Sequence, residues 1–196
     1  MNFERWRHYA RGWLLHFFGR EERAFDEFVL AFRHDPTDVQ AARHLAFIAA
    51  QKQRFEVAEQ WFVETLRLAP EDADTHFNLG YVREQMGRPR EALAAFAEAA
   101  RLKPILDRAW YGQGLAHAAL GEHAQAVAAF DEATKLQPMN AIAWYQLGMA
   151  CHKAGDADRV KAVVAHLVGF DPKMARQIVR DSGRDDLAKL IPELPF

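Results

Sequence analysis

Large apolar residues and prolines recur every 34 residues along most of the chain. The phenylalanine position reads Phe28, Phe62, Phe96, Phe130 and then Val164. The proline position reads Pro36, Pro70, Pro104, Pro138 and Pro172. A regular period of this length indicates an array of one small unit and not a single irregular core. The chain is therefore predicted to use one structural unit five times.

Each unit is predicted to hold two closely packed helices. Counted from 31 residues before each proline, the units are 5–38, 39–72, 73–106, 107–140 and 141–174. The eighth position reads Gly12, Ala46, Gly80, Gly114 and Gly148, and the twentieth reads Ala24, Ala58, Ala92, Ala126 and Val160. Small side chains there would let the two helices approach, with the phenylalanine filling the space beside their contact.

Stop and start signals separate the two helices of a unit. Glycine stands at the fifteenth position in four units, where it suits the left-handed conformation that closes a helix. These glycines are Gly19, Gly87, Gly121 and Gly155. The second unit has Gln53 there, a departure expected to cost up to about 1 kcal/mol. Pro89 suits a first helical turn, Asp156 suits an N-cap, and Thr37 with Gln40 suggests a capping box. No segment alternates as a strand does, so the chain is predicted to be all-α.

The pattern changes after Pro172. Residues 173–182 are predicted to form an amphipathic helix with Met174, Ile178 and Val179 on one side. Residues 185–191 suggest a short helical turn that Pro192 and Pro195 would stop. We expect residues 175–196 to cap the last helix pair, since end units meet solvent. The alternative is a docking tail that ends in Leu194-Pro195-Phe196.

Composition narrows the function class. Half of the residues are hydrophobic, which supplies a packed interior and argues against disorder. The net charge of −2 gives no basic face for nucleic acid. Cys151 is the single cysteine, so no intramolecular disulfide can form. This count is consistent with a reducing compartment.

No apolar run has the length of a membrane-spanning helix, and residues 13–18 are interrupted by His16. The first twenty residues carry four arginines, as organellar presequences do, but this segment already keeps the repeat register. The expected location is the cytoplasm.

Candidate chemistry is weak. The histidines lack the H-E-x-x-H spacing of a helical zinc site, and Gly112-Gln113-Gly114 lacks the strand and third glycine of a dinucleotide loop. The carboxylate pairs Glu21-Glu22 and Asp185-Asp186 stand where helices start, as the helix dipole favours. Cys151 fits a buried, inert thiol. We expect no catalytic residue, no metal site and no cofactor.

The repeat resembles the tetratricopeptide repeat, a 34-residue helix–turn–helix with a W-x2-L-G motif, a small residue, phenylalanine and proline. The fifth unit carries Trp144, Leu147 and Gly148, and the fourth carries Trp110 and Gly114 with Gln113 in place of leucine. The third unit has His76 for tryptophan but keeps Leu79 and Gly80, and the first has His8 and Arg11. The resemblance covers residues 5–174. It implies a right-handed α-solenoid that binds proteins without being an enzyme.

The resemblance also implies a binding groove on the concave face, lined by the first helix of each unit. Its second, fifth, ninth, twelfth and thirteenth positions would point into the groove. The fifth position reads Tyr9, Arg43, Phe77, Tyr111 and Tyr145, and the ninth reads Trp13, Phe47, Tyr81, Leu115 and Met149. Tyrosine at the fifth position often packs between repeats in this family. The ninth frequently holds asparagine, so large apolar residues there indicate a groove for apolar side chains.

One subset of the family clamps the C-terminal carboxylate of chaperone tails. Three of the five clamp places are met here, by Arg43, Asn78 and Arg108. Phe47 and Gly112 hold the other two, so the clamp is incomplete. Arg43 and Arg108 could still pair with an acidic group of a partner.

The leading hypothesis is a non-enzymatic, co-chaperone-like adaptor that holds a peptide or helical segment of another protein in this groove. The alternative is a structural subunit that self-associates or docks into a larger complex through its convex face or C-terminal helix. An enzyme would need an acid–base or metal constellation. RNA-binding relatives have basic repeats of a different length, against the 34-residue period and slightly acidic chain here.

Overall fold

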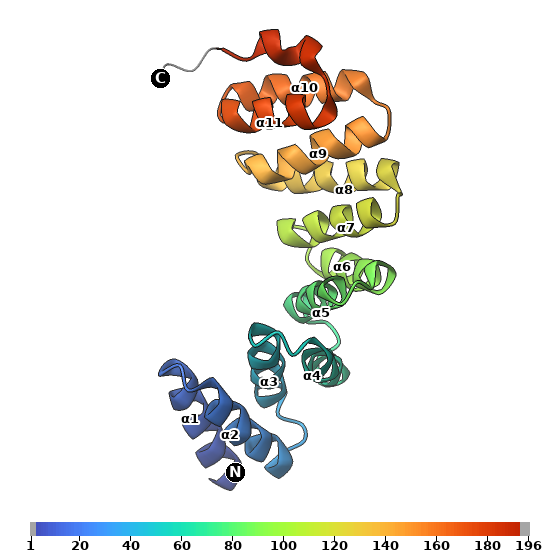
Figure 1. Cartoon of the computed structure of the whole chain (residues 1–196). Coiled ribbons are helices and arrows are strands. Elements are labelled where there is room, and N and C mark those ends of the chain that lie inside the picture. The colour runs from blue at the N-terminus through green and yellow to red at the C-terminus, as the bar shows by residue number, and fades with distance from the viewer. Residues whose placement is uncertain (1–2, 193–196) are drawn as a thin grey trace. The chain divides into compact units, whose positions relative to one another are not determined.

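A computed structural model describes residues 3–192, which form paired antiparallel helices along the chain (Figure 1). The elements are α1 (Phe3–Phe17), α2 (Glu21–His34), α3 (Val39–Gln51), α4 (Phe55–Leu68), α5 (Ala73–Gln85), α6 (Pro89–Leu102), α7 (Asp107–Ala119), α8 (His123–Leu136), α9 (Ala141–Lys153), α10 (Ala157–Val168), α11 (Pro172–Ser182) and the 3-10 helix η1 (Asp185–Leu190). No strand occurs within residues 3–192. The predicted all-α fold of tandem helical hairpins is confirmed.

The second helices of the hairpins keep the sequence period. They begin at Glu21, Phe55, Pro89, His123 and Ala157, each 34 residues after the one before. Pro89 is thus the first helical residue of α6, as predicted. None of the helices in the described part of the chain is both long and apolar enough to cross a membrane.

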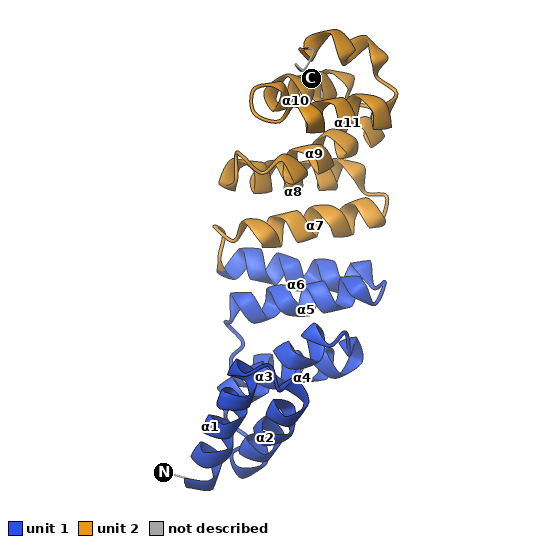
Figure 2. Ribbon diagram, turned by 60° about the vertical axis from the view of Figure 1, so that its left-hand side comes forward, with its two compact units in different colours: residues 1–102 blue, residues 103–196 orange. Residues whose placement is uncertain are grey.

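The chain divides into two compact units, residues 1–102 and 103–196 (Figure 2). The first unit contains α1 to α6, and the second contains α7 to α11 and η1. Each unit has buried apolar clusters of its own. In the first unit these centre on Phe28 and Phe62, and in the second on Phe130, Leu147 and Ile178.

The phenylalanines of the repeat fill the contact between paired helices, as predicted. Phe28, Phe62, Phe96 and Phe130 are all essentially inaccessible to solvent. A Cβ atom placed on Gly80 would lie 2.6 Å from the Phe96 ring, and one on Gly114 would lie 2.5 Å from the Phe130 ring. These distances are shorter than a real contact, so glycine is what lets the ring sit against the neighbouring backbone.

The turn between paired helices adopts the left-handed conformation at the predicted position. The backbone angle φ is +69° at Gly19, +71° at Gly87, +76° at Gly121 and +78° at Gly155. Gln53 adopts the same conformation, with φ of +57°, and is the one non-glycine residue with positive φ in the described chain. Its side chain therefore bears the steric strain that glycine avoids.

Gln53→Gly is expected to raise the free energy of unfolding by up to about 1 kcal/mol, because relief of the left-handed strain outweighs the added freedom of the unfolded chain. Urea denaturation followed by circular dichroism measures the change. Gln53→Ala keeps the strain and serves as the control, with no gain expected. A Gln53→Gly protein no more stable than the parent would show that Gln53 is not strained.

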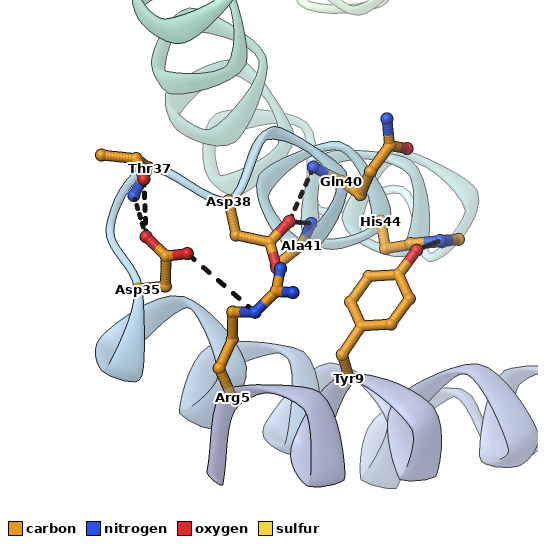
Figure 3. A network of polar contacts seen from close by, with 8 residues as sticks. All are labelled: Arg5, Tyr9, Asp35, Thr37, Asp38, Gln40, Ala41 and His44. Atoms are coloured by element: carbon orange, nitrogen blue, oxygen red, sulfur yellow. Dashed lines mark hydrogen bonds and ion pairs between the residues drawn. The ribbon is translucent and has the colours of Figure 1, made fainter. Parts of the chain in front are cut away.

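The start of α3 corrects one sequence prediction. Thr37 and Gln40 do not form a capping box. Asp38 is the N-cap, and its carboxylate accepts from the backbone N–H groups of Gln40 and Ala41 at 3.0 and 3.1 Å (Figure 3). The Thr37 hydroxyl instead donates to Asp35 at 2.6 Å. Aspartate accepts the N-terminal N–H groups and its charge favours the helix dipole, so it takes the place predicted for threonine.

Asp38 also ties the first hairpin to the second. The Arg5 guanidinium of α1 donates to the Asp38 carboxylate at 2.7 Å and has Asp35 4.0 Å away (Figure 3). Further along, Asp156 caps α10 by accepting from the Arg159 N–H at 3.0 Å, which confirms the prediction for that start.

Three of the five recurring prolines contact an aromatic ring nitrogen in the repeat that follows. The indole Nε1 of Trp110 donates to the carbonyl oxygen of Pro104 at 2.8 Å, and that of Trp144 to Pro138 at 2.8 Å. His76 lies at the same position, with Nε2 2.9 Å from the oxygen of Pro70. The ring donor thus fixes the turn that precedes its own helix.

The end of the described chain follows the predicted amphipathic pattern. Pro172 begins α11, one residue before the predicted start, and Asp171 caps the helix. Ile178 and Val179 are buried, and Met174 packs partly against the same cluster. The Ile178 Cδ1 atom lies 2.8 Å from where a Cβ of Gly148 would be, so α11 rests closely on α9.

Contact of α11 with both α9 and α10 is what a terminal cap requires, and the cap assigned to residues 175–196 stays a prediction. Pro195 and the tail segment 194–196 lie outside the described residues.

Candidate functional site

A cavity of about 550 Å³ opens in the first unit, where α3, α4 and α5 meet. It is lined by Phe47, Ala50, Gln51, Gln53, Phe55, Phe62, Phe77, Asn78, Tyr81 and Gln85. Four of these residues, Phe47, Phe77, Asn78 and Tyr81, are candidates from the sequence. The structure therefore brings together one part of the predicted band.

The repeat register positions the aromatic side chains of this cavity. Phe47 and Tyr81 occupy the ninth position of successive units, and their side chains are 48% and 44% exposed. Phe77 lies one helical turn before Tyr81 and shares its face of α5. The Phe77 ring is half-buried, 5.7 Å from the Phe96 ring. Phe77 is thus held by the core, while Phe47 and Tyr81 present open ring surface.

The polar side chains of the cavity are uncharged. Gln51, Gln53, Asn78 and Gln85 contribute side-chain amides, and Tyr81 contributes a hydroxyl. An amide side chain offers both donors and acceptors, as the peptide backbone does. The cavity can therefore accept an apolar side chain and hydrogen-bond the backbone on either side of it, without requiring a charge on the ligand.

The tyrosines of the fifth position make packing contacts. The Tyr9 hydroxyl lies 3.2 Å from His44 Nε2 (Figure 3), and its ring packs edge-on against Phe28. Tyr145 donates to the Asp181 carboxylate at 2.9 Å, and the Tyr111 ring lies 5.6 Å from the Phe130 ring. These contacts favour the packing interpretation of this position.

The same surroundings perturb titration at two of these tyrosines. Burial, then the Asp38 charge, raises the pKa of Tyr9. Burial, then the hydrogen bond to Asp181, raises the pKa of Tyr145. Burial, then the nearby His16, lowers the pKa of His44, which favours the neutral form of the ring beside Tyr9.

The remaining ninth-position residues lie outside the cavity. Trp13 is 51% exposed and stacks on Phe17, with ring centroids 5.8 Å apart. Leu115 and Met149 belong to the second unit and are half-buried. The continuous aromatic band along all five units remains a prediction.

The basic residues predicted for the groove do not line this cavity, and their place in a longer groove stays a prediction. Arg43 does not line the cavity, because its guanidinium forms an ion pair with Asp72 and donates to Gln40 at 3.3 Å. Burial raises the pKa of Asp72, but hydrogen bonds from Thr75 and the Arg43 charge outweigh it, and the pKa is lowered. Arg108 is exposed in the second unit. Of the three clamp candidates, only Asn78 lines the cavity.

Several cavity residues were missed by the sequence reasoning. Gln51 and Gln85 share the thirteenth position of their units, which the resemblance places in the groove, so a signal for them existed. Phe55 and Phe62 come from α4, the second helix of its hairpin, and the register gave no such signal for that helix.

Reactive groups outside the cavity are few. Cys151 is fully buried, and burial raises the pKa of its thiol to about 11, which suits the predicted inert thiol. The expectation of no metal site stays a prediction, but one group of ligand-type side chains bears on it. Glu4, His8 and His34 have ligand atoms within 4.8 Å of one another. Glu4 and His8 lie on α1, and His34 lies on α2. The H-E-x-x-H pattern concerns a single helix and therefore does not detect this group.

One family model and several solved structures are similar to this chain. The family model described as tetratricopeptide repeat matches residues 16–73, 77–138 and 113–159. No curated protein matches the chain.

Solved structures similar to this chain share its fold. One is YrrB, described as a TPR protein with an unusual peptide-binding site, at 21% identity over 88% of this chain and 90% of that chain, with a TM-score of 0.79. A MamA protein is 18% identical over 100% of both chains, with a TM-score of 0.80. MamA from Desulfovibrio magneticus RS-1 is 19% identical over 92% of this chain and 98% of that chain, with a TM-score of 0.78. Identities this low carry the fold alone.

Proposed function

Since this chain belongs to the tetratricopeptide-repeat family, we propose that it is a non-enzymatic interaction protein that holds a segment of another protein between α3 and α5. Repeats of this family generally serve protein–protein interaction. The observation that carries the proposal is the cavity at this place, with exposed Phe47 and Tyr81 above half-buried Phe77.

The size and chemistry of the cavity suit a peptide. Its volume of about 550 Å³ lies within the usual range of ligand sites. That space takes one or two large side chains together with the backbone that carries them. Aromatic rings give large contact area with few rotatable bonds, which makes Phe47 and Tyr81 suitable anchors.

The uncharged lining of the cavity limits the kinds of partner segment that it can bind. Asn78, Gln51 and Gln85 can hydrogen-bond the backbone of an extended segment, so specificity would come from an apolar side chain seated between them. Arg43 is already paired with Asp72, so an acidic group is not a requirement for binding here. The similar YrrB has a peptide-binding site by description, which supports a peptide as occupant.

The double variant Phe47→Ala/Tyr81→Ala is expected to weaken binding of an apolar peptide at least tenfold, since each truncation of an interface anchor typically costs more than 1 kcal/mol. Arrayed peptides first identify a binder, and fluorescence anisotropy then measures its affinity. Tyr111→Ala is not combined with these substitutions. Tyr111 packs on Phe130, so its removal would change stability as well as binding.

Two controls make this test specific. Ile142→Ala removes an apolar side chain that is 58% exposed in the second unit and should leave binding unchanged. Trp13→Ala removes an exposed aromatic residue outside the cavity, and a loss with this variant would indicate the longer predicted band. Equal affinity of the double variant and the parent would refute the proposed site.

A second function is favoured by a separate observation. The side chains of Trp13, Leu14, Phe17 and Phe18 are each at least half exposed, at the C-terminal end of α1 and just beyond it. Exposed apolar groups of this kind mark association surfaces. The alternative is a structural subunit that self-associates or docks through such a surface, which light scattering over a range of concentrations distinguishes from a monomer. Cytoplasmic location and co-chaperone-like action also stay proposals.

A further inference from the structure

A cluster of ligand-type side chains joins the first two helices at the end remote from their connecting turn. Glu4 and His8 lie one turn apart on α1, and His34 is the last residue of α2. One ligand atom of each lies within 4.8 Å of those of the other two. None of the three lines the cavity between α3 and α5.

A carboxylate orients the central histidine. The Nδ1 atom of His8 lies 2.6 Å from the Glu27 Oε2 atom, and the His8 side chain is almost fully buried. A charged carboxylate accepts a proton on Nδ1, which leaves the Nε2 lone pair available for coordination. Metal-binding histidines in proteins are commonly held by a carboxylate in this way.

The spacing of the two imidazoles is compatible with a shared ion. The ring centroids of His8 and His34 lie 5.6 Å apart and the rings are stacked, with an interplanar angle of 9°. A ring nitrogen coordinates a metal within the plane of its ring, so the His34 ring must turn out of this stack before both histidines reach one ion. A tetrahedral zinc ion with nitrogen ligands at about 2.0–2.1 Å would set the two centroids about 5 Å apart. Two such ligand nitrogens lie about 3.4 Å apart, so ligand atoms that are now up to 4.8 Å apart must close by up to about 1.5 Å. Metal binding requires Glu4 to leave its ion pair with Arg7 at 2.7 Å, and it requires the exposed His34 ring to leave its present contacts, the stack on His8 among them.

We propose that Glu4, His8 and His34 bind a divalent transition-metal ion of the zinc type, with Glu27 orienting His8. Two histidines and one carboxylate form a known zinc ligand set that leaves a position for water or another ligand. Because the ligands come from α1 and α2, the ion stabilises the first hairpin and raises its unfolding temperature with metal concentration.

The test uses the full chain, freed of tags, treated with a chelator and then titrated with Zn²⁺ by calorimetry. We expect one equivalent to bind and the melting temperature to rise. Co²⁺ should give a visible absorption band in the ligand-field region. His34→Ala and Glu4→Gln should each weaken binding at least tenfold, and Glu27→Gln should weaken it about 10- to 100-fold.

The matched control is His123→Ala, which removes a half-buried histidine of the second unit and should leave the titration unchanged. Circular dichroism checks that each variant is folded, and His34→Gln replaces His34→Ala if it is not. Absence of binding by the parent chain would overturn the proposal. So would equal weakening by His123→Ala, which would indicate adventitious binding to scattered histidines.

Discussion

Phe130→Ala is expected to lower the free energy of unfolding by about 3–5 kcal/mol, the range for removing a buried aromatic ring. The Phe130 side chain is wholly buried in the apolar cluster of the second unit. Its ring contacts Tyr111 and lies against the Gly114 backbone. Glycine has no side chain that can move into the space, so most of the cavity would persist.

Urea denaturation followed by circular dichroism measures this loss. Phe130→Leu retains part of the volume and should lose less than Phe130→Ala. Met139→Ala serves as the control, since Met139 is 71% exposed and its truncation should change stability by less than about 0.5 kcal/mol. A loss below about 1 kcal/mol for Phe130→Ala would contradict the assigned role of the ring.

The contact with Gly114 makes the prediction sharper. Gly114→Ala in the parent should cost about 1–3 kcal/mol, because the added methyl group meets the ring. In the Phe130→Ala background the same methyl group enters the vacated space and should cost less. Ala46 at the equivalent position of the second hairpin coexists with buried Phe62, so a hairpin can adapt to the methyl group at the cost of a small shift. Strict additivity would show that Gly114 and Phe130 do not contact.

The repeat register could be predicted because its signals are local and recur. Gly87 and Gly121 end their helices in the left-handed conformation, and Phe96 and Phe130 are buried beside Gly80 and Gly114. Each requirement concerns residues of one hairpin, within about thirty positions of sequence. Each further copy of the pattern specifies the same helical hairpin. The fold class therefore follows from the period of the sequence.

The partner residues in contacts between successive repeats could not be predicted from the same pattern. Tyr9 meets His44, and Tyr145 meets Asp181, each across about one repeat length. A tyrosine at the fifth position is suitable both for lining a groove and for packing between repeats. Which of the two it does depends on its contact residue, and that residue belongs to the next repeat. The exposed surface of Phe47 and Tyr81 likewise depends on what their neighbours leave uncovered.

Polar side chains that compete for the same hydrogen-bonding and charged groups explain the other differences between the sequence predictions and the structure. Asp38 and Asp72 stand at the last position of successive units and cap the helices that follow. This recurrence was a usable signal, and it would have replaced the capping box proposed for Thr37. The ion pair of Asp72 with Arg43 carries no such recurring signal, because it depends on a side chain of α3. The metal-ligand cluster has no such recurrence, because it occurs in the first hairpin alone among the described residues.

Trp144→Ala is expected to lower the free energy of unfolding by about 3 kcal/mol, the lower end of the range for a tryptophan, because Trp144 is half-buried. Its ring centroid lies 4.1 Å from that of His166 on α10. Its indole N–H donates to the Pro138 carbonyl at 2.8 Å, which ties α9 to the turn before it. The substitution removes both contacts and leaves that carbonyl without this donor.

Trp144→Phe separates the two contributions, because it keeps most of the ring packing and removes the donor. Its expected cost is about 1 kcal/mol, the usual net value of one hydrogen bond. Thermal and urea unfolding measure both variants, and peptide affinity is measured in parallel under conditions where each is folded. Trp144 lies outside the unit that holds the cavity, so affinity per folded molecule should not change. Unchanged stability of Trp144→Ala would remove Trp144 from the packed core, and a loss of affinity in a fully folded variant would show that binding extends into the second unit.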